Sequence, residues 1–418
     1  MVDIGIRRET INAQERRAAL APQHVDELVR EHGFSVVVQP SSKRIYPDDS
    51  YRKAGAILQQ DLSGCKVVLG IKEILADHVR EGGTYLCFSH VIKGQHENMP
   101  LLQRMLDRRA TLIDYEPIVD RFGRRLLFFG RHAGYAGMID ALWTLGRRMR
   151  AEGIETAFAG VRQSTEYRSV QEATEILAST VGARIRERGI DPSIHPLVVG
   201  FTGGGNVSSG AQDILGHLPV VEIEPGDLAT LHEKTHASRR VVYKVVFRRQ
   251  FRQNFAEHLP HLTLLVNGIY WEPGHPKIAT RQELRALWQG SETPKLKVIA
   301  DLSADIGGSI EATLRQTTPD DPVFVYDPET HSELAGVEGR GPVMLTVGNL
   351  PAEFPRDASE HFGDSLFPFL SGLRNADYGV SFEHLSLPAA VLGAVITHAG
   401  ELTPRYRYLQ EYLTKEAP

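Results

Sequence analysis

Polar side chains able to exchange protons follow three successive apolar segments in the first third of the chain. They are Lys72 with Glu73, Ser89 with His90 and Lys93, and Asp114 with Glu116. Histidine is the side chain used most often for proton transfer near neutral pH, and lysine can join it when burial or cationic neighbours lower its pKa from about 10.4. One such residue at a strand end is more often structural, but their repetition at successive strand ends favours an acid–base site.

The elements that must hold these side chains alternate between strand-like and helix-like patterns over the first 130 residues. Apolar runs such as SVVVQ and VVLGI are typical of strands, and PQHVDELVREHG is typical of an amphipathic helix. Alternation of this kind predicts a parallel sheet with helices on its faces. Ligands bind at the carboxyl ends of the strands in such sheets, which is where the polar clusters stand.

A glycine-rich segment, FTGGGNVSSGA at 201–211, follows another apolar strand and opens a helix. Glycine lets the backbone approach a pyrophosphate closely, and the helix N-terminus presents unpaired N–H groups to the anion. Ser208 replaces the third glycine of the usual pattern and Gly210 lies two residues further on, so the helix packing can differ in detail. The predicted cofactor-binding residues are Gly203, Gly205, Asn206, Val207 and Ser208 of this loop and Asn267 further along the chain.

The next strand, VVEIEP, carries Glu222 and Glu224. An acidic side chain about twenty residues after the glycine loop commonly binds the adenosine ribose hydroxyls. Glu224, at the strand end, is the better candidate, and its carboxylate would repel a 2′-phosphate and favour NAD over NADP. A strand end that merely faces solvent is the alternative interpretation.

The order of elements predicts an α/β chain of two Rossmann-like domains with parallel sheets and an active-site cleft between them. Residues 1–130 plus roughly 345–418 are expected to form the substrate (catalytic) domain, 131–195 connecting helices, and 196–344 the dinucleotide-binding domain. The long helix expected at 131–150 carries an apolar stripe, which predicts a packed face. This stripe consists of Met138, Leu142, Leu145 and Met149.

Two other regions give weaker patterns. The segment 226–262 is polar and irregular, and its basic residues Arg248, Arg249 and Arg252 indicate a solvated insertion rather than a nucleic-acid patch. The C-terminal stretches PAAVLGAV and PRYRYLQEYL look helical.

Composition narrows the function classes. A chain of 418 residues with 42% hydrophobic and 24% charged residues suits two or three folded domains. The net charge of −5, without a long basic run, argues against nucleic-acid or membrane partners. Apolar segments are too short for a signal peptide or a membrane span, and two cysteines make no disulfide framework, so we expect the cytoplasm. The histidines show no metal-ligand spacing, so we expect no metal.

Longer motifs make the chain resemble a known family. It is similar to the lysine–2-oxoglutarate reductase domain of aminoadipate semialdehyde synthase in the motifs ERRAALAP, VVLGIKE, FSHVIKGQ, FGRHAGYAGMIDAL, FTGGGNVSSGAQ, LVNGIYW and DLSADIGGSIEAT. More distantly it resembles the L-lysine-forming saccharopine dehydrogenase, and the wider relatives are alanine dehydrogenase and the nicotinamide nucleotide transhydrogenase subunit. The resemblance runs from the first strand to at least residue 368.

The resemblance implies an enzyme that interconverts L-lysine plus 2-oxoglutarate with saccharopine, using a nicotinamide cofactor. It implies that Lys72 and His90 are the catalytic acid–base groups. The other implied site residues are Arg17, Lys93, Glu116, Arg125 and Asp301 for substrate binding, and Glu15 and Glu73 for tuning. Saccharopine carries three carboxylates, which suit cationic side chains and above all the bidentate fork of arginine.

The identity of the cofactor depends on opposing signals. Glu224 argues for NADH, whereas relatives with a similar VEP strand use NADPH, so the carboxylate can point away from the ribose. Arg239 or Arg240 could then reach a 2′-phosphate. We therefore expect NADP(H) slightly ahead of NAD(H).

Two rival functions stay open at this point. One is another amino-acid dehydrogenase of the alanine dehydrogenase superfamily, against which the string DLSADIGGSIEAT argues. The other is a nucleotide-sensing protein that kept the fold, against which the retained Lys72, His90, Glu116 and Arg125 argue. The expected partners are lysine, 2-oxoglutarate and saccharopine, and a homo-oligomer is compatible with the sequence.

Overall fold

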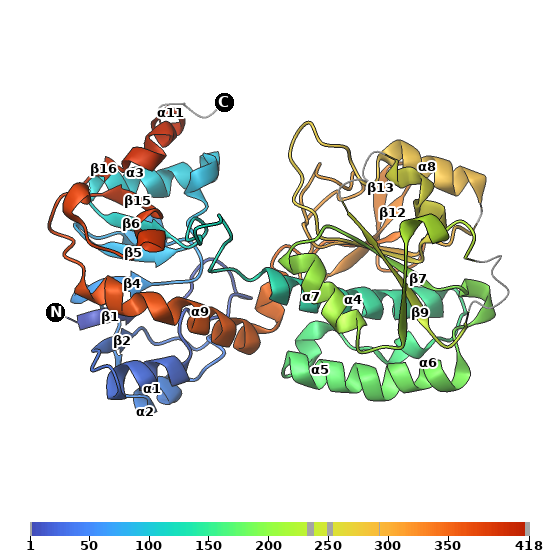
Figure 1. The fold of residues 1–418 in the computed structure, drawn as a ribbon, viewed down its shortest axis with the longest axis horizontal. Coiled ribbons are helices and arrows are strands. Elements are labelled where there is room, and N and C mark those ends of the chain that lie inside the picture. Colours follow the sequence, from blue (N-terminus) through green and yellow to red (C-terminus); the bar gives the residue numbers. More distant parts are fainter. Residues whose placement is uncertain (1, 232–237, 249–253, 292, 414–418) are drawn as a thin grey trace. The chain divides into compact units, whose positions relative to one another are not determined.

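The computed structural model describes residues 2–231, 238–248, 254–291 and 293–413. The chain divides into two compact units, one made of Met1–Phe129 with Pro355–Pro418 and the other of Gly130–Phe354 (Figure 1). The chain therefore leaves the first unit after residue 129 and returns to it at 355. The expected domain ranges and the cleft between the domains stay predictions.

An eight-stranded sheet forms the middle of the first unit, in the order β16-β15-β6-β5-β4-β1-β2-β3. Its strands are β1 (Val2–Ile6), β2 (Val36–Val38), β3 (Ile57–Leu58), β4 (Cys65–Leu69), β5 (Thr84–Cys87), β6 (Thr111–Asp114), β15 (Val395–His398) and β16 (Glu401–Leu402). The neighbours from β3 to β6 are all parallel, so their carboxyl ends share one edge. β15 pairs antiparallel with both β6 and β16.

Alternating side chains along these strands fill a core on each face of the sheet. On β4, Val67 joins the core formed with helices α1 (Pro22–Arg30) and α9 (Pro355–Asn375). Val68 joins the opposite core, formed with α3 (Met99–Asp107). Figure 1 shows α1 and α9 on one side of this sheet and α3 on the other. The remaining helices of this unit are α2 (Asp48–Lys53), α10 (Ala389–Leu392) and α11 (Gln410–Leu413).

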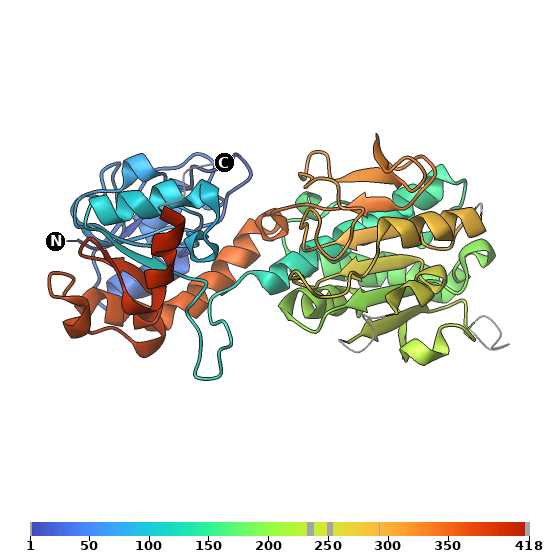
Figure 2. The same ribbon diagram turned by 90° about the horizontal axis from the view of Figure 1, so that it is seen from above.

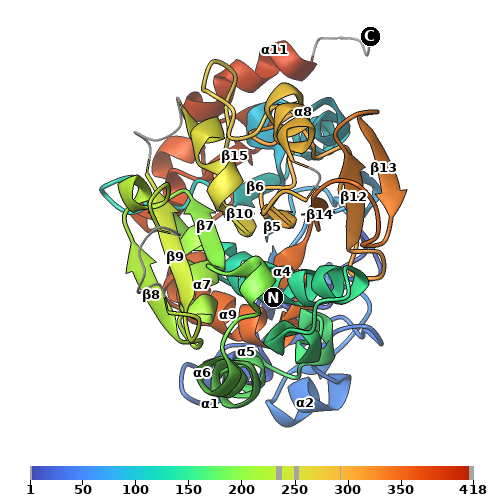
Figure 3. The ribbon, with the colours of Figure 1, turned by 90° about the vertical axis from the view of Figure 1, so that its right-hand side faces the viewer.

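The second unit contains another eight-stranded sheet, in the order β13-β12-β14-β11-β10-β7-β9-β8 (Figure 3). Its strands are β7 (Val198–Thr202), β8 (Val220–Ile223), β9 (Val242–Phe247), β10 (Leu264–Asn267), β11 (Val298–Asp301), β12 (Val323–Asp327), β13 (Ser332–Ala335) and β14 (Val343–Leu345). All neighbours are parallel except β12, which runs antiparallel to β13 and β14.

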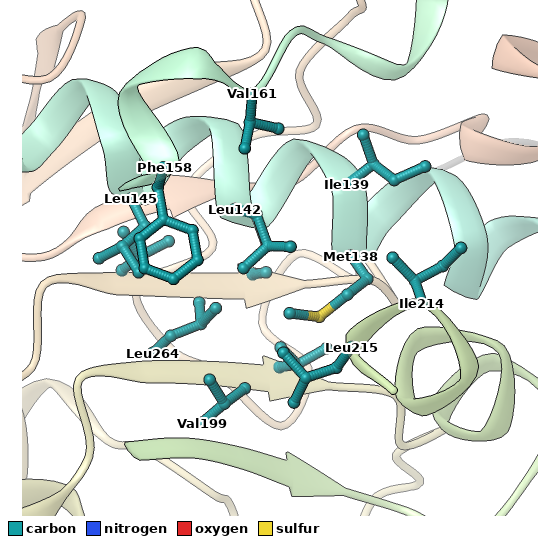
Figure 4. Packing of buried hydrophobic residues seen from close by; sticks show 14 of the residues in the cluster. Met138, Ile139, Leu142, Leu145, Phe158, Val161, Val199, Ile214, Leu215 and Leu264 are labelled. Atoms are coloured by element: carbon teal, nitrogen blue, oxygen red, sulfur yellow. The ribbon is translucent and has the colours of Figure 1, made fainter. Parts of the chain in front are cut away.

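Helix α4 (Gly130–Ala151) covers one face of the second sheet. The predicted stripe is confirmed, because Met138, Leu142, Leu145 and Met149 are fully buried. Figure 4 shows three of these side chains directed toward the strands, among residues such as Val199 of β7. The other helices of this unit are α5 (Val170–Ile176), α6 (Ala183–Arg188), α7 (Asn206–Leu215) and α8 (Arg281–Gly290).

Glycines let α4 and α7 approach closely. A Cβ atom on Gly134 would lie 2.1 Å from the carbonyl oxygen of Val207, and one on Gly210 would lie 2.3 Å from the carbonyl oxygen of Arg131. Gly210 therefore provides the close helix packing that a third glycine at position 208 would otherwise provide.

The predicted α/β fold with two Rossmann-like sheets is confirmed, and two local predictions are wrong. The segment 226–262 is not irregular throughout, because it contains strand β9. This strand pairs in parallel with β7 on one side and with β8 on the other. The stretch PAAVLGAV is helical only over Ala389–Leu392, after which Val395–His398 forms β15. Arg249 and Arg252 of the predicted basic insertion lie outside the described residues.

Among the helices that the structure describes, none has the length and apolar character needed to cross a membrane.

Candidate active site

Lys72, Glu73 and His90 lie at the carboxyl edge of the first sheet. β4 and β5 are parallel neighbours, so the turn after β4 lies beside the turn after β5. The Oε2 atom of Glu73 is 3.4 Å from Nδ1 of His90. Burial raises the pKa of Glu73, but hydrogen bonds from His90 and from its own backbone N–H, with the charges of His90 and Lys72, hold the pKa below its usual value. An ionised carboxylate thus lies beside both predicted acid–base groups.

The backbone at His90 is left-handed, with φ 56° and ψ 12°. Residues other than glycine adopt this conformation rarely, and such strained positions cluster at functional sites. The chain turns here into the short 3₁₀ helix Val91–Lys93, whose last residue, Lys93, is exposed. The His90 side chain is 35% exposed and can therefore be reached by a ligand.

A buried ion pair after β1 fixes the turn that carries Lys72. Glu9 accepts hydrogen bonds from the backbone N–H groups of Ile71 at 2.7 Å and Lys72 at 3.0 Å. It also pairs with Arg7 at 3.1 Å, and Arg7 donates to the carbonyl oxygens of Lys72 and Glu73. Arg7 and Glu9 are not among the predicted site residues, although VDIGIRRE ends on charged residues just as the neighbouring strand segment VVLGIKE does.

A second buried carboxylate, Asp114 at the end of β6, fixes the turn that carries His90. It accepts hydrogen bonds from the backbone N–H of Ser89 at 3.0 Å and from the Ser89 hydroxyl. It also accepts one from the backbone N–H of Glu116 at 2.7 Å. In the order β6-β5-β4-β1, the two inner strands carry His90 and Lys72, and the two flanking strands carry the anchoring carboxylates.

Glu15 and Arg17 form a buried two-point ion pair. Arg17 donates from Nε to one Glu15 oxygen at 2.8 Å and from Nη2 to the other at 2.5 Å. Its guanidinium also lies over the Phe129 ring, 4.2 Å from the centroid. Glu15 therefore already occupies the fork of Arg17 that was predicted to bind a substrate carboxylate, and the tuning role predicted for Glu15 stays a prediction.

Glu116 and Arg125 lie in the loop after β6, which projects from the first unit as a hairpin (Figure 2). The two side chains form an ion pair, and Val119 and Arg125 form an isolated antiparallel bridge. The Glu116 side chain is 10% exposed and that of Arg125 is 53% exposed. Arg125 therefore keeps donor groups open to solvent and to a ligand.

The glycine loop of the second unit joins the end of β7 to the start of α7. Gly203 has φ 88°, and a Cβ atom there would lie 2.9 Å from the carbonyl oxygen of Gly268. Positions Gly204 and Gly205 face open space, since an added Cβ would meet nothing within 4 Å. Asn206 is exposed and Val207 half-buried, whereas Ser208 is buried and its Oγ accepts a hydrogen bond from Gln212. The open backbone ahead of α7 fits a pyrophosphate.

Asp301 and Asn267 belong to a sealed network at the ends of β7, β10 and β11. Asn267 accepts from the Thr202 hydroxyl at 2.6 Å and donates to Asp301 Oδ1 at 2.8 Å. Asp301 Oδ2 accepts from the Thr313 hydroxyl at 2.6 Å. Burial raises the pKa of Asp301, although these hydrogen bonds oppose the shift. Both residues are fully buried, so the ligand contacts predicted for them stay predictions, and the contacts present tie three strand ends together.

The strand that carries Glu222 and Glu224 is not the neighbour of the glycine-loop strand. β9 lies between β7 and β8, so Glu224, which is exposed, stands two strands away from β7. Glu222 pairs with Lys244 of β9 at 2.6 Å. The residue that follows the end of β9 beside the glycine loop is Arg248, which is exposed.

Arg239 and Arg240 precede β9 and therefore lie at the amino edge of the sheet. β9 is parallel to β7 and spans Val242–Phe247, so its length separates both arginines from the glycine loop. The Nε of Arg239 donates to the carbonyl oxygen of Ile190 at 2.8 Å. The structure thus argues against the expectation that Arg239 or Arg240 reaches a 2′-phosphate.

Comparison with known proteins places both units in one family. Residues 5–136 match the family "Alanine dehydrogenase/PNT, N-terminal domain" and residues 169–405 match "Alanine dehydrogenase/PNT, C-terminal domain". A solved structure of an L-alanine dehydrogenase superimposes with a TM-score of 0.62 over 99% of this chain and 100% of that chain, at 20% identity. A transhydrogenase from Sinorhizobium meliloti gives 0.54 over 96% and 98%, at 16% identity.

Curated relatives are closer in sequence. The mitochondrial alpha-aminoadipic semialdehyde synthase of Rattus norvegicus is 37% identical over 98% of this chain and 47% of its own length. The saccharopine dehydrogenase [NAD(+), L-lysine-forming] of Emericella nidulans is 27% identical over 90% of this chain and 92% of its own length. These relatives confirm the resemblance drawn from the motifs. The chain spans about half the length of the semialdehyde synthases it matches, and the name of the rat protein places that relative in mitochondria, so a cytoplasmic location stays a prediction.

Proposed function

The chain belongs to the alanine dehydrogenase/PNT family, and we propose that it is an oxidoreductase interconverting L-lysine plus 2-oxoglutarate with saccharopine. The names of its relatives, which include an L-lysine-forming saccharopine dehydrogenase, support this substrate set. The observation that carries the proposal is the group formed by Lys72, Glu73 and His90 at one sheet edge, on turns that buried carboxylates anchor.

The reaction needs proton transfer at two groups of the substrates. The lysine ε-ammonium must lose a proton before its nitrogen attacks the keto carbon of 2-oxoglutarate, and we assign this proton to Lys72. The carbinolamine that forms must gain a proton on its hydroxyl so that water leaves and an imine remains, and we assign this proton to His90. A bound nicotinamide supplies the hydride that reduces the imine carbon. Each positioned acid or base contributes about 100- to 10,000-fold to the rate.

Substrate carboxylates need cationic partners near these groups. Arg125 and Lys93 are the exposed cations on the loops that carry Glu116 and His90. Arg17 is a weaker candidate because its fork is bound to Glu15. We therefore assign direct carboxylate binding to Arg125 and Lys93, and a supporting role to the pair of Glu15 and Arg17.

A single assay separates this function from its rivals. Oxidation of NADPH or NADH is followed spectrophotometrically with lysine plus 2-oxoglutarate, and in parallel with pyruvate plus ammonia. Turnover with the first pair alone is the expected result. Turnover with the second pair alone would indicate another amino-acid dehydrogenase, and absence of turnover with any pair would favour a nucleotide-binding protein without catalysis.

We infer that the cofactor is NADP(H) and that Arg248 binds its 2′-phosphate. In Rossmann sheets the adenosine ribose lies over the end of the strand beside the glycine-loop strand. That neighbour is β9, and Arg248 follows its last residue. Glu224, the residue that would disfavour a 2′-phosphate, is one strand further out. The name of the fungal relative prints NAD(+), so the proposal of NADP(H) rests on the position of Arg248 and not on the names of the relatives.

The cofactor proposal is tested by binding, independently of turnover. Affinities for 2′,5′-ADP and 5′-AMP are measured by calorimetry for the unmodified chain, Arg248→Ala and Arg240→Ala. A hydrogen bond to a charged group is worth about 1.5–3 kcal/mol, so Arg248→Ala should lose roughly 10- to 100-fold in affinity for 2′,5′-ADP alone. Arg240→Ala, at the other end of β9, should bind like the unmodified chain. Equal losses for both ligands, or no loss, would contradict the assignment.

A further inference from the structure

A large cavity lies in the second unit, at the sheet edge opposite the glycine loop. Its volume is about 810 Å³, within the usual range for small-molecule sites. Lys297, one of its lining residues, directly precedes β11, whereas Gly203 directly follows β7. β7, β10 and β11 run parallel, so the cavity and the glycine loop are at opposite ends of the same strands. The cavity is therefore separate from the proposed cofactor site.

The charged lining of this cavity is strongly biased toward cations. Arg148, Lys295, Lys297 and Arg340 line it, and among the lining residues that the structure describes the one carboxylate is Glu152. That carboxylate is already shared by two cations. One of its oxygens accepts from Arg148 Nε at 2.6 Å, and the other pairs with Lys297 Nζ at 2.8 Å. Both oxygens of Glu152 thus already contact a cation, and neither contacts Lys295 or Arg340 among the described ion pairs.

Lys295 and Arg340 are the lining cations outside this pairing, and the charge of Arg340 also acts on Asp327 and Glu329 beyond the lining. Within the described ranges, neither forms an ion pair with a carboxylate. Arg340 donates one hydrogen bond, from Nη2 to the carbonyl oxygen of Trp288 at 3.0 Å. Burial lowers the pKa of Lys295 to about 8 because the ammonium loses solvation. Lys295 is half-buried and Arg340 is exposed, so an anion bound in the cavity would offset the lost solvation of the ammonium and remain within reach of the guanidinium.

We propose that this cavity binds a small organic anion carrying two or more carboxylate or phosphate groups, held by Lys295 and Arg340. The walls also offer apolar surface from Ile154, Leu296 and Trp288, which suits a carbon skeleton between the charged groups. Arginine binds carboxylate and phosphate through a planar fork, and lysine adds a point charge, so the pair accepts either chemistry. This site requires neither Lys72 nor His90 and goes beyond the proposed reaction.

The test uses the full chain in the presence of saturating NADPH, which occupies the glycine-loop site. Citrate and inorganic pyrophosphate are titrated separately by calorimetry, so that the two arms distinguish a carboxylate ligand from a phosphate ligand. We expect at least one of them to bind, and Lys295→Gln and Arg340→Gln each to weaken it by about tenfold or more, because each removes a charged hydrogen bond. Arg186→Gln is the matched control, since Arg186 is exposed on α6 and is not among the residues that line the cavity.

A second substitution at position 295 distinguishes a folding defect from the loss of a contact with the anion. Lys295→Arg retains the charge and should bind close to the unmodified affinity, whereas Lys295→Gln should not. Failure of both anions to bind at concentrations on the order of 10 mM would overturn the proposal. Binding that is equal in the unmodified chain, Lys295→Gln and Arg186→Gln would also overturn it. Lysine-dependent turnover is measured separately, so its loss would count against the proposed function and not against this site.

Discussion

The carboxyl edges of the two sheets differ in what they present to a ligand. The edge of the first sheet presents side chains, because Lys72 and His90 are partly exposed on turns that Glu9 and Asp114 anchor. The edge of the second sheet presents main-chain atoms, because the loop Gly203–Gly205 leaves open space at the N-terminus of α7. An acid–base site needs exposed groups on fixed turns, whereas a dinucleotide site needs room against the main chain. The two edges should therefore fail under different kinds of substitution.

Removal of an acid–base side chain should have the largest effect. His90→Ala and Lys72→Met are each expected to lower kcat by about 100- to 10,000-fold, since each removes a positioned proton-transfer group. His96→Ala is the control, because His96 is an exposed histidine six residues further on. Steady-state rates with lysine, 2-oxoglutarate and reduced cofactor give the measurement, and an unchanged kcat in either variant would rule out its assigned role.

At the edge of the second sheet, a substitution that disturbs the backbone of the glycine loop should have the largest effect on cofactor affinity. Gly203→Ala places a Cβ 2.9 Å from the Gly268 carbonyl oxygen at a residue with φ 88°. A left-handed conformation costs a non-glycine residue about 1–2 kcal/mol, so cofactor affinity should fall by roughly tenfold, with kcat at saturating cofactor much less affected. Gly226→Ala is the control, since a Cβ there meets nothing within 4 Å. Cofactor titrations showing equal affinity for both variants would remove the distinction between the edges.

The anchoring carboxylates should have an intermediate effect. Glu9→Gln keeps the shape of the side chain but weakens its contacts with Arg7 and with the amides of Ile71 and Lys72. Breaking one partner of a buried ion pair costs about 3–5 kcal/mol, so Tm should fall, and the displaced turn should lower kcat by about tenfold.

A positioning role for Glu9 predicts more than lost stability. The pH profile of kcat should shift, because the turn that carries Lys72 and Glu73 moves relative to His90. Glu97→Gln, at an exposed position, should change neither Tm nor the profile. A lower Tm with an unchanged pH profile would show that Glu9 supports the fold alone.

Local pattern was enough to predict most strands and the groups at their ends. KVVLGIKE and TYLCFSH each place a polar group just after an apolar run, so Lys72 and His90 could be predicted to lie on neighbouring strand ends. The anchoring roles of Glu9 and Asp114 are harder to predict, because their hydrogen-bond partners follow other strands and are distant in the sequence. Sequence spacing does not record which backbone N–H a carboxylate will meet.

The order of strands was the part that the pattern could not supply. β9 was missed because its alternation includes Lys244 and basic residues flank it, which makes it look like a solvated segment. In the sheet, Lys244 is neutralised by Glu222 of β8, so a charge that argued against a strand becomes a cross-strand pair. Insertion of β9 between β7 and β8 then moved Glu224 away from the position that its spacing predicted.

A buried acid pair in the second unit differs from the anchors of the first. Glu9 and Asp114 accept hydrogen bonds from backbone amides. Asp140 and Glu353 share one donor, the Ser164 hydroxyl, and both are almost fully buried; Asp140 also accepts from the Ser164 backbone N–H at 2.7 Å. Burial raises the pKa of both carboxyls, and the charge of Asp140 raises that of Glu353 further. The folded chain therefore retains a proton that the unfolded chain releases.

The smallest expected effect follows from this retained proton. Because the folded state binds more protons than the unfolded state, the free energy of unfolding should fall as pH rises from about 4.5, the ordinary pKa of Glu353, through its raised folded value. Glu353→Gln removes this titration, so the variant should gain stability relative to the unmodified chain between pH 5 and pH 9. Urea unfolding at both pH values measures the difference, with Glu187→Gln on the exposed side of α6 as the control. Parallel pH dependence in all three proteins would show that the acid pair releases its proton without regard to folding.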